Sequence, residues 1–169
     1  MSQAEESLYE LAQRLGAVLA ARGWYMAAAE SCTGGGVARA VTEIAGSSTW
    51  FERGFVTYTN AAKHEMLGVP EETLERHGAV SAATVEAMVT GALTHSHADV
   101  AVAVSGVAGP GGGTDAKPVG TVWFAWASRG HPPEAHVEQL SGDRQAVREQ
   151  SIRIALEGVI QEAEERYAS

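Results

Sequence analysis

Residues 27–36 read AAAESCTGGG, and this stretch decides the fold. Small apolar residues typical of a buried strand lead into an acid, three hydroxyl or thiol side chains and three glycines, after which a helical pattern begins. Such a junction concentrates free backbone N–H groups at the positive end of the helix dipole. Ser31 can there bind an anion or act as a nucleophile beside an oxyanion site. The alternative is a helix cap beside packing glycines, for which Thr33 is the better candidate.

Helical and strand-like patterns alternate along the rest of the chain. Helices are expected over residues 3–22, 35–44, 60–67, 70–78, 81–97 and 143–167. Strands are expected over residues 24–29, 54–58, 99–105, 119–127 and 134–140, the last at an edge. Gly23 and Gly46 end the first two helices, while Asn60 and Ser81 cap two later ones. We expect one α/β domain over residues 1–169, a three-layer α/β/α sandwich whose mixed, mostly parallel sheet has about five strands.

The composition is that of an ordinary globular protein, with 45% hydrophobic and 20% charged residues. The formal net charge of −9 argues against a general nucleic-acid-binding surface. The single cysteine, Cys32, excludes an intrachain disulfide and fits a reducing compartment. The acidic N-terminus lacks the apolar core of a signal peptide, and no apolar run has the length of a membrane span. We therefore expect a soluble cytoplasmic protein that binds neither nucleic acid nor membrane.

A second informative stretch runs from Tyr58 to Lys63, where a strand-like pattern passes into a helix. Both side chains can turn toward the crevice at the end of the sheet, where open α/β sheets bind their ligands. A tyrosine and a lysine near a serine suggest a hydrolase without histidine, in which lysine is the base. The alternative is a lysine on the helix surface and a partly buried strand tyrosine.

The loop after Ser105 contains six glycines within residues 106–120. It is not a Walker A loop, because Gly112 stands where that motif has lysine. It is not the dinucleotide fingerprint either, because it joins two strands rather than a strand and a helix. A bare turn needs one or two glycines, so this loop favours a nest of backbone N–H donors that binds a ligand.

Arg144 falls in the first turn of the last helix, which Ser141 or Asp143 can cap, and Arg148 lies one turn further on the same face. A cation in the first turn opposes the helix dipole at a cost of about 0.3–1 kcal/mol. The position favours an anion opposite Arg144, such as a ligand phosphate or a carboxylate across an interface. The alternative is a solvated arginine.

The remaining titratable residues indicate no metal site and no cofactor. The six histidines form no metal-ligand spacing. No histidine is placed in the sequence to activate the Cys32 thiol, which we expect to be a small buried side chain.

Seven segments together resemble the CinA C-terminal domain family, in the family's order and across nearly the whole chain. They are residues 29–35, 46–48, 58–63, 78–81, 105–110, 117–121 and 142–144. Their joint occurrence is far more specific than any one of them. Two departures are visible, because Ser105 stands where the family usually has threonine and Arg53 stands where a second glycine is usual before Gly54.

The resemblance implies a stand-alone amidase that hydrolyses the carboxamide of nicotinamide mononucleotide to nicotinic acid mononucleotide and ammonia. It also implies a homo-oligomer, a dimer or larger. The implied catalytic residues are a serine nucleophile with lysine and tyrosine, at Ser31, Lys63 and Tyr58. The expected substrate contacts are Thr33, Gly34, Gly35, Ser105, Gly106, Gly109, Gly111 and Arg144.

In the implied mechanism Ser31 attacks the amide carbon, and Lys63 takes the serine proton directly or through Tyr58. Backbone N–H groups around residues 33–35 hold the oxyanion, and the phosphate rests on the 106–113 loop, near Arg144 or Lys117.

This mechanism requires Lys63 to lose its charge near neutral pH, so its pKa must fall from about 10.4 to about 7. Burial and the positive helix end after Ser31 are the expected causes. The alternative from a different class is a non-catalytic nucleotide-binding or protein-interaction module, which would not require Tyr58 together with Lys63.

Overall fold

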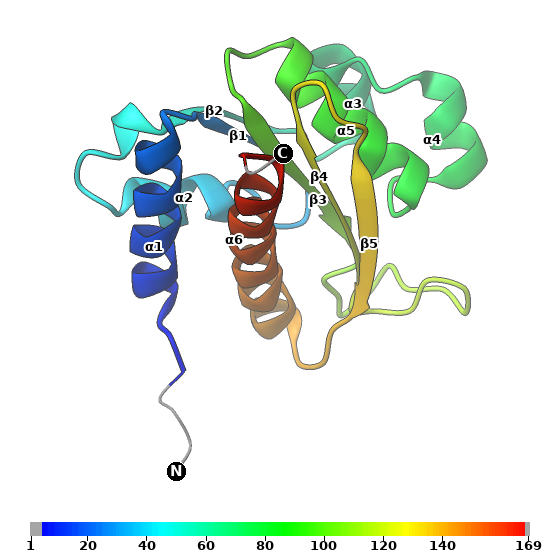
Figure 1. Ribbon diagram of the computed structural model, residues 1–169. Coiled ribbons are helices and arrows are strands. Elements are labelled where there is room, and N and C mark those ends of the chain that lie inside the picture. The colour runs from blue at the N-terminus through cyan, green and yellow to red at the C-terminus, as the bar shows by residue number, and fades with distance from the viewer. Residues whose placement is uncertain (1–4, 168–169) are drawn as a thin grey trace.

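The computed structural model describes residues 5–167, in which one sheet lies between two layers of helices (Figure 1). The helices are α1 (Leu8–Arg22), α2 (Gly36–Thr42), the short 3-10 helix η1 (Ser47–Thr49), α3 (Asn60–Leu67), α4 (Glu71–His77), α5 (Ala82–Thr94) and α6 (Arg144–Tyr167). The strands are β1 (Met26–Glu30), β2 (Phe51–Val56), β3 (Val100–Gly106), β4 (Thr121–Ser128) and β5 (Glu134–Gln139).

The sheet has five strands in the order β2-β1-β3-β4-β5. Strand β1 pairs in parallel with β2 and with β3, whereas β4 is antiparallel to both β3 and β5. Four strands therefore run in one direction and β4 runs against them, although only two of the four pairings are parallel. The expected mixed α/β sheet of about five strands is confirmed.

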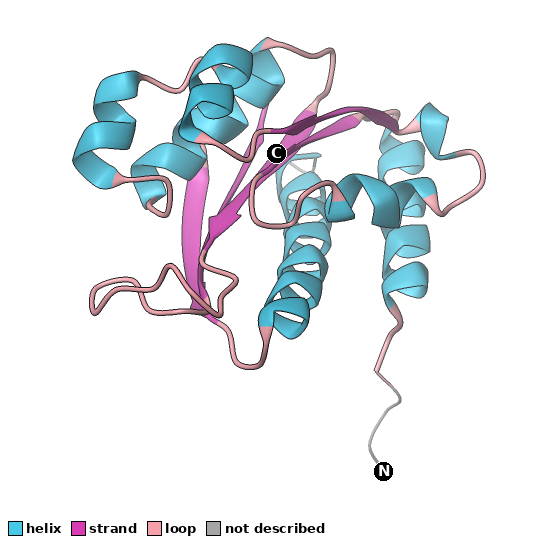
Figure 2. Ribbon diagram, turned by 180° about the vertical axis from the view of Figure 1, so that it is seen from behind, coloured by secondary structure: helices cyan, strands magenta, loops and turns pink. Residues whose placement is uncertain are grey.

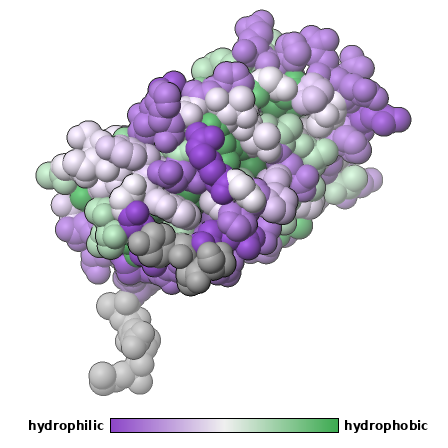
Figure 3. Space-filling model, turned by 45° about the horizontal axis from the view of Figure 1, so that its top comes forward, coloured by the Kyte–Doolittle hydropathy of each residue, from purple (hydrophilic) through white to green (hydrophobic). Residues whose placement is uncertain are grey.

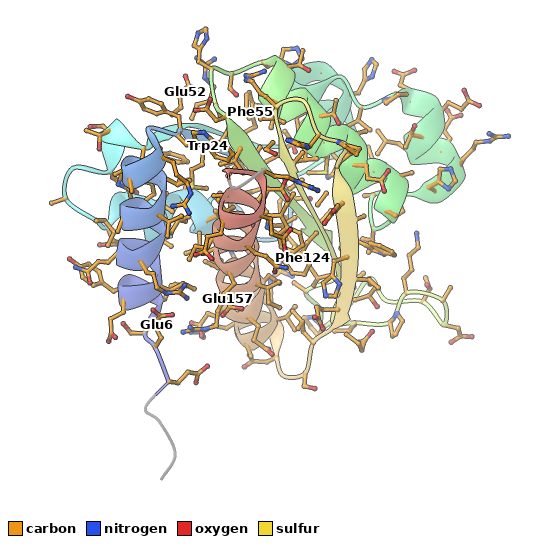
Figure 4. The ribbon with its side chains drawn as sticks, viewed as in Figure 1. Glu6, Trp24, Glu52, Phe55, Phe124 and Glu157 are labelled. Carbon is orange, nitrogen blue, oxygen red and sulfur yellow. The ribbon has the colours of Figure 1, made fainter. Side chains whose placement is uncertain are left out.

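Alternating side chains on the strands build two different cores. Val100, Val102 and Val104 face the layer of α1, α2 and α6, together with Met26 and Phe124. The residues between them are alanines, and they face α5 and the α3–α4 segment. Because alanine is short, the helices on this second face can approach the sheet closely. Phe124, labelled in Figure 4, comes from β4 and is fully buried in the first core.

Figure 2 shows from behind that helices cover both faces of the sheet. On the face seen in Figure 3, hydrophilic residues surround small hydrophobic patches. Among the described residues, no helix combines the length and the apolar character needed to cross a membrane.

Most predicted caps are confirmed. Gly23 ends α1 in the left-handed conformation, and Ser81 accepts a hydrogen bond from the Thr84 N–H at the start of α5. Asp143 Oδ1 accepts the Ala146 N–H at 2.9 Å and so caps α6.

Several predicted boundaries were wrong. Thr59 rather than Asn60 caps α3, because its hydroxyl accepts the Ala62 N–H. Strand β2 begins at Phe51, since pairing with Met26 extends it before the β-branched run. Helix α1 begins at Leu8, and the residues before Glu5, where we expected its start, lie outside the described part. Helices α2 and α5 end earlier than expected, at Thr42 and Thr94.

Gly158 on α6 tests how closely the layers pack. A Cβ at this position would overlap the indole ring of Trp126, whose Nε1 donates to the Ala155 carbonyl at 3.0 Å. Helix propensity alone would make Gly158→Ala stabilising by about 1 kcal/mol. We expect instead a loss of about 1–3 kcal/mol in the free energy of unfolding, because the overlap forces the ring to move.

Chemical denaturation of the two variants and their combination measures this effect. In a Trp126→Leu background the overlap disappears, so Gly158→Ala should become neutral or stabilising. A Gly158→Ala protein as stable as the parent would contradict the packing described.

Candidate active site

The carboxyl ends of the three parallel strands converge at one edge of the sheet. Ser31 follows β1 and donates its N–H to the Val104 carbonyl at 3.0 Å. Thr57 follows β2 and donates its N–H to the Glu30 carbonyl at 2.8 Å. Strand β1 lies between β2 and β3. Ser31 therefore lies where the connections that leave neighbouring strands separate from one another. Such a point is the usual ligand crevice of an open α/β sheet.

Lys63 and Ser31 meet in this crevice. Lys63 Nζ lies 2.9 Å from Ser31 Oγ, 3.0 Å from the Thr57 carbonyl oxygen and 3.4 Å from the Tyr58 carbonyl oxygen. Lys63 is 1% exposed and Ser31 is 7% exposed. Within residues 5–167 the amine has no carboxylate partner. The surface-lysine alternative is therefore wrong.

Burial sets the protonation of the crevice. Removal from water lowers the pKa of Lys63 below its ordinary value of 10.5, because the charged ammonium is penalised. Burial also raises the pKa of the Cys32 thiol to about 11. The thiol therefore stays protonated at neutral pH, and Cys32 is a buried core residue rather than an activated nucleophile.

The pair lines a cavity of about 320 Å³, which lies at the lower end of the range for small-molecule sites, about 300–1,000 Å³. The structure brings four predicted substrate contacts to this cavity, namely Ser105, Gly106, Gly109 and Gly111. Ser105 is 1% exposed, and among the described residues its hydroxyl has no hydrogen-bonding partner. The glycine loop after β3 therefore forms a wall of the crevice, as its composition indicated.

Arg144 also lines the cavity, but its partners in the protein are neutral. Its Nη1 donates to the Gly109 carbonyl at 2.7 Å and its Nη2 to the Tyr58 hydroxyl at 3.0 Å. The loop that contains Gly109, yellow-green in Figure 1, lies at the same end of the molecule as the first turn of α6. Lys117 does not line the cavity, and its Nζ donates to the His77 carbonyl at 2.7 Å. Of the two cations considered for phosphate binding, the structure places Arg144 at the site.

Tyr58 lies in the crevice in a different way from the one expected. Tyr58 is 57% exposed, and its hydroxyl accepts a hydrogen bond from Arg144. Lys63 contacts Tyr58 only through the backbone carbonyl.

Glu30 is a buried residue beside the site whose role as a helix cap the sequence analysis missed. Glu30 is 1% exposed, and its carboxylate accepts hydrogen bonds from the Thr33 hydroxyl at 2.6 Å, the Val37 N–H at 2.8 Å and the Ala38 N–H at 3.0 Å. The protein's own carboxylate therefore caps α2, and the prediction that Thr33 caps it was wrong. The signal in the sequence was an acid at the end of an apolar strand, directly before a helix N-terminus.

Some of the N–H donors expected in the turn after Ser31 are already hydrogen-bonded within the protein. Gly34 donates its N–H to the Ser31 carbonyl at 3.0 Å, so this N–H cannot hold an oxyanion. Gly35 precedes α2 with φ +99°, a conformation that requires glycine. Neither Gly34 nor Gly35 lines the cavity, whereas Cys32 does.

A larger groove of about 1130 Å³ adjoins the crevice and shares Ala108 and Arg144 with it. Thr33 and Arg148 also line this groove. In the part of the chain that the structure describes, no group of three or more His, Cys, Asp or Glu side chains is placed to bind a metal ion.

An α/β sandwich with a buried serine–lysine pair at the end of its parallel strands defines the class of this protein. The chain belongs to the CinA C-terminal domain family, whose sequence model matches residues 8–163.

Similar proteins cover almost the whole chain. A protein from Enterobacter agglomerans named nicotinamide-nucleotide amidohydrolase PncC is 55% identical over 158 residues, which are 94% of this chain and 96% of that protein. A protein of the same name from Escherichia coli strain K12 is 53% identical over the same shares. The crystal structure of the competence/damage inducible protein CihA from Agrobacterium tumefaciens has a TM-score of 0.90 at 48% identity, covering 95% of this chain and 98% of that one.

The buried amine predicts a pH-dependent stability. Because the pKa of Lys63 is lowered in the folded protein, the unfolded chain binds more protons at any pH between the folded value and 10.5. The free energy of unfolding should therefore rise with pH in this window, by at most about 1.4 kcal/mol per pH unit. Lys63→Met should remove this rise.

Urea unfolding between about pH 6 and pH 8.5 measures the difference between the two proteins. The upper limit matters because the raised pKa of Cys32 makes stability fall as pH rises from 9.0 toward about 11. Parallel pH profiles for the parent and Lys63→Met would contradict a pKa of Lys63 that is lowered into this range.

Proposed function

We propose that this chain hydrolyses the carboxamide of nicotinamide mononucleotide to give nicotinic acid mononucleotide and ammonia. The observation that carries the proposal is the 2.9 Å contact between Lys63 Nζ and Ser31 Oγ inside a buried crevice. The PncC relatives, 53–55% identical over 94% of the chain, support the substrate and the reaction by their name.

The surroundings of Lys63 suit a neutral amine that acts as a base. A neutral amine has two N–H donors and one lone pair. The carbonyl oxygens of Thr57 and Tyr58 can accept both donors, which directs the lone pair at the Ser31 hydroxyl. In this state Ser31 donates its proton to Lys63, which increases the nucleophilicity of its oxygen.

The proposed reaction then runs through an acyl-serine intermediate. Ser31 Oγ forms a bond to the amide carbon while its proton passes to Lys63, and the carbonyl oxygen becomes an oxyanion. The C–N bond breaks when Lys63 returns the proton to the departing ammonia. A water molecule next attacks the ester carbon, Lys63 accepts its proton, and Ser31 leaves with that proton as the acid product forms.

The cavity supports a small planar amide with an anionic extension. Backbone from the glycine loop forms one wall, so a flat ring can approach closely, and the free Ser105 hydroxyl can bind a polar group of the substrate. Arg144 lies at the same cavity and supplies the positive charge that a phosphate requires.

The proposal also covers the domain organisation, the cellular location and the assembly of the protein. We propose a single functional domain, a cytoplasmic location consistent with a lone buried thiol, and a homo-oligomer of two or more subunits. The competing class, a non-catalytic nucleotide-binding module, would not require a buried lysine amine on a serine hydroxyl.

The central test measures ammonia release from nicotinamide mononucleotide. Ser31→Ala and Lys63→Met should each lower kcat by at least about 1,000-fold, because one removes the nucleophile and the other its base. Ser48→Ala, which changes an exposed serine, serves as the matched control and should leave kcat unchanged. Excess chelator should also leave the rate of the parent unchanged.

Circular dichroism establishes that the variants are folded. An inactive parent would favour the binding-module alternative, and a fully active Ser31→Ala protein would exclude the serine mechanism.

Tyr58→Phe distinguishes direct proton transfer from a tyrosine relay. The Tyr58 hydroxyl is bound to Arg144 rather than to Lys63, so its removal should disturb substrate binding more than chemistry. We expect KM to rise several-fold while kcat stays within about threefold of the parent. A fall of about 100-fold or more in kcat would instead indicate that Tyr58 transfers the proton.

A further inference from the structure

Arg148 on α6 binds the turn that follows the nucleophile. Its Nε donates to the Cys32 carbonyl at 3.0 Å and its Nη2 to the Thr33 carbonyl at 3.2 Å, across a separation of 116 and 115 residues. Among the described residues Arg148 forms no ion pair with a carboxylate. Gly34 leaves room for this contact, since a Cβ there would come within 3.3 Å of Arg148 Nη2.

This contact fixes the direction of a backbone N–H group. A trans peptide unit is planar, and its carbonyl and N–H point in opposite directions. Because Arg148 holds the Cys32 carbonyl toward α6, the Thr33 N–H of the same peptide unit must point away from α6. The Cys32 N–H is fixed in a similar way, since the Ser31 carbonyl accepts from Gly34.

In the described part of the chain, no other residue accepts a hydrogen bond from the Cys32 N–H or the Thr33 N–H. Cys32 is 5% exposed and Thr33 is 1% exposed. Buried N–H groups nearly always find an acceptor, so two adjacent unpaired ones beside Ser31 require an explanation. An oxygen atom of a bound substrate would supply the missing acceptor.

The start of α2 cannot take this role. The Glu30 carboxylate already accepts the Val37 and Ala38 N–H groups, which are the donors that a helix N-terminus would otherwise offer to an anion. The backbone N–H donors that remain close to Ser31 are therefore those of the turn that Arg148 holds.

We infer that Arg148 is a positioning residue for the oxyanion site, because it holds the Cys32–Thr33 peptide with its N–H toward the oxygen that becomes charged when Ser31 attacks. This inference rests on the proposed function, since an oxyanion forms there only if Ser31 is the nucleophile. Arg148 touches neither Ser31 nor Lys63, and it acts through the backbone alone.

Steady-state kinetics of ammonia release from nicotinamide mononucleotide test the inference. Arg148→Met removes both donors, and we expect kcat to fall by about 100-fold with KM within about threefold of the parent, as when one oxyanion donor is lost. Arg148→Lys keeps one donor and should give an intermediate kcat. Arg153→Met is the matched control. Arg153 lies on the same helix and forms a long ion pair with Glu5, at 4.0 Å, so the kinetics of this variant should match those of the parent.

Three outcomes overturn the inference: an unchanged kcat for Arg148→Met, a loss expressed only in KM, or unfolding of both Arg148 variants in circular dichroism. If only Arg148→Met unfolds, a lowered kcat of Arg148→Lys supports the inference and an unchanged one overturns it. Ser31→Ala is measured in parallel. Failure of the proposed function appears as an inactive parent or an active Ser31→Ala protein, whereas failure of this inference alone appears as an active parent, an inactive Ser31→Ala protein and an unaffected Arg148→Met protein.

Discussion

The structure depends on one unusual constraint, a lysine amine placed inside the protein without a carboxylate. An isolated buried ammonium is strongly disfavoured, so a buried lysine either finds an anion or loses its proton. Here the amine faces a serine hydroxyl and two carbonyl groups of the segment that leaves β2. These groups can stabilise a neutral amine without restoring its charge. The same burial that destabilises the fold at low pH therefore favours the neutral amine that the proposed mechanism requires.

The sheet topology explains why these groups meet. Strand β1 is central, and its two parallel neighbours are β2 and β3. The chain leaves all three strands at the same edge, so Ser31, Thr57 and Ser105 come together although they are far apart in sequence. Because β4 is antiparallel to β3, the glycine loop that joins them lies at that same edge, where it forms a wall of the crevice. An all-parallel sheet would have required a helical crossover in its place.

Much of the fold was predictable, because it follows from local patterns. The valine–alanine alternation of residues 100–104 predicted a buried strand, and the structure uses its two faces for two different cores. The family segments predicted that Ser31 and Lys63 belong to one site, and the structure places them in contact. Boundaries were less predictable, because strand pairing rather than propensity decides where β2 begins. The contacts of Glu30 and Arg148 were not predicted, since a carboxylate that folds back on its own helix and an arginine 116 residues away leave no local pattern.

Glu30 changes the explanation for the lowered pKa of Lys63. The expected causes were burial and the positive end of the helix after Ser31. The first-turn N–H groups of that helix are already bound by the Glu30 carboxylate, whose negative charge offsets the dipole. Burial alone is then the cause that lowers the pKa. The capping of α2 by Glu30 also matters for the proposed mechanism, because a free helix N-terminus would attract anions to Ser31. With Glu30 capping α2 on one side and Arg148 bound to the turn on the other, the unpaired backbone N–H groups next to Ser31 have a fixed direction, which in the proposed mechanism favours a developing oxyanion over a resident ion.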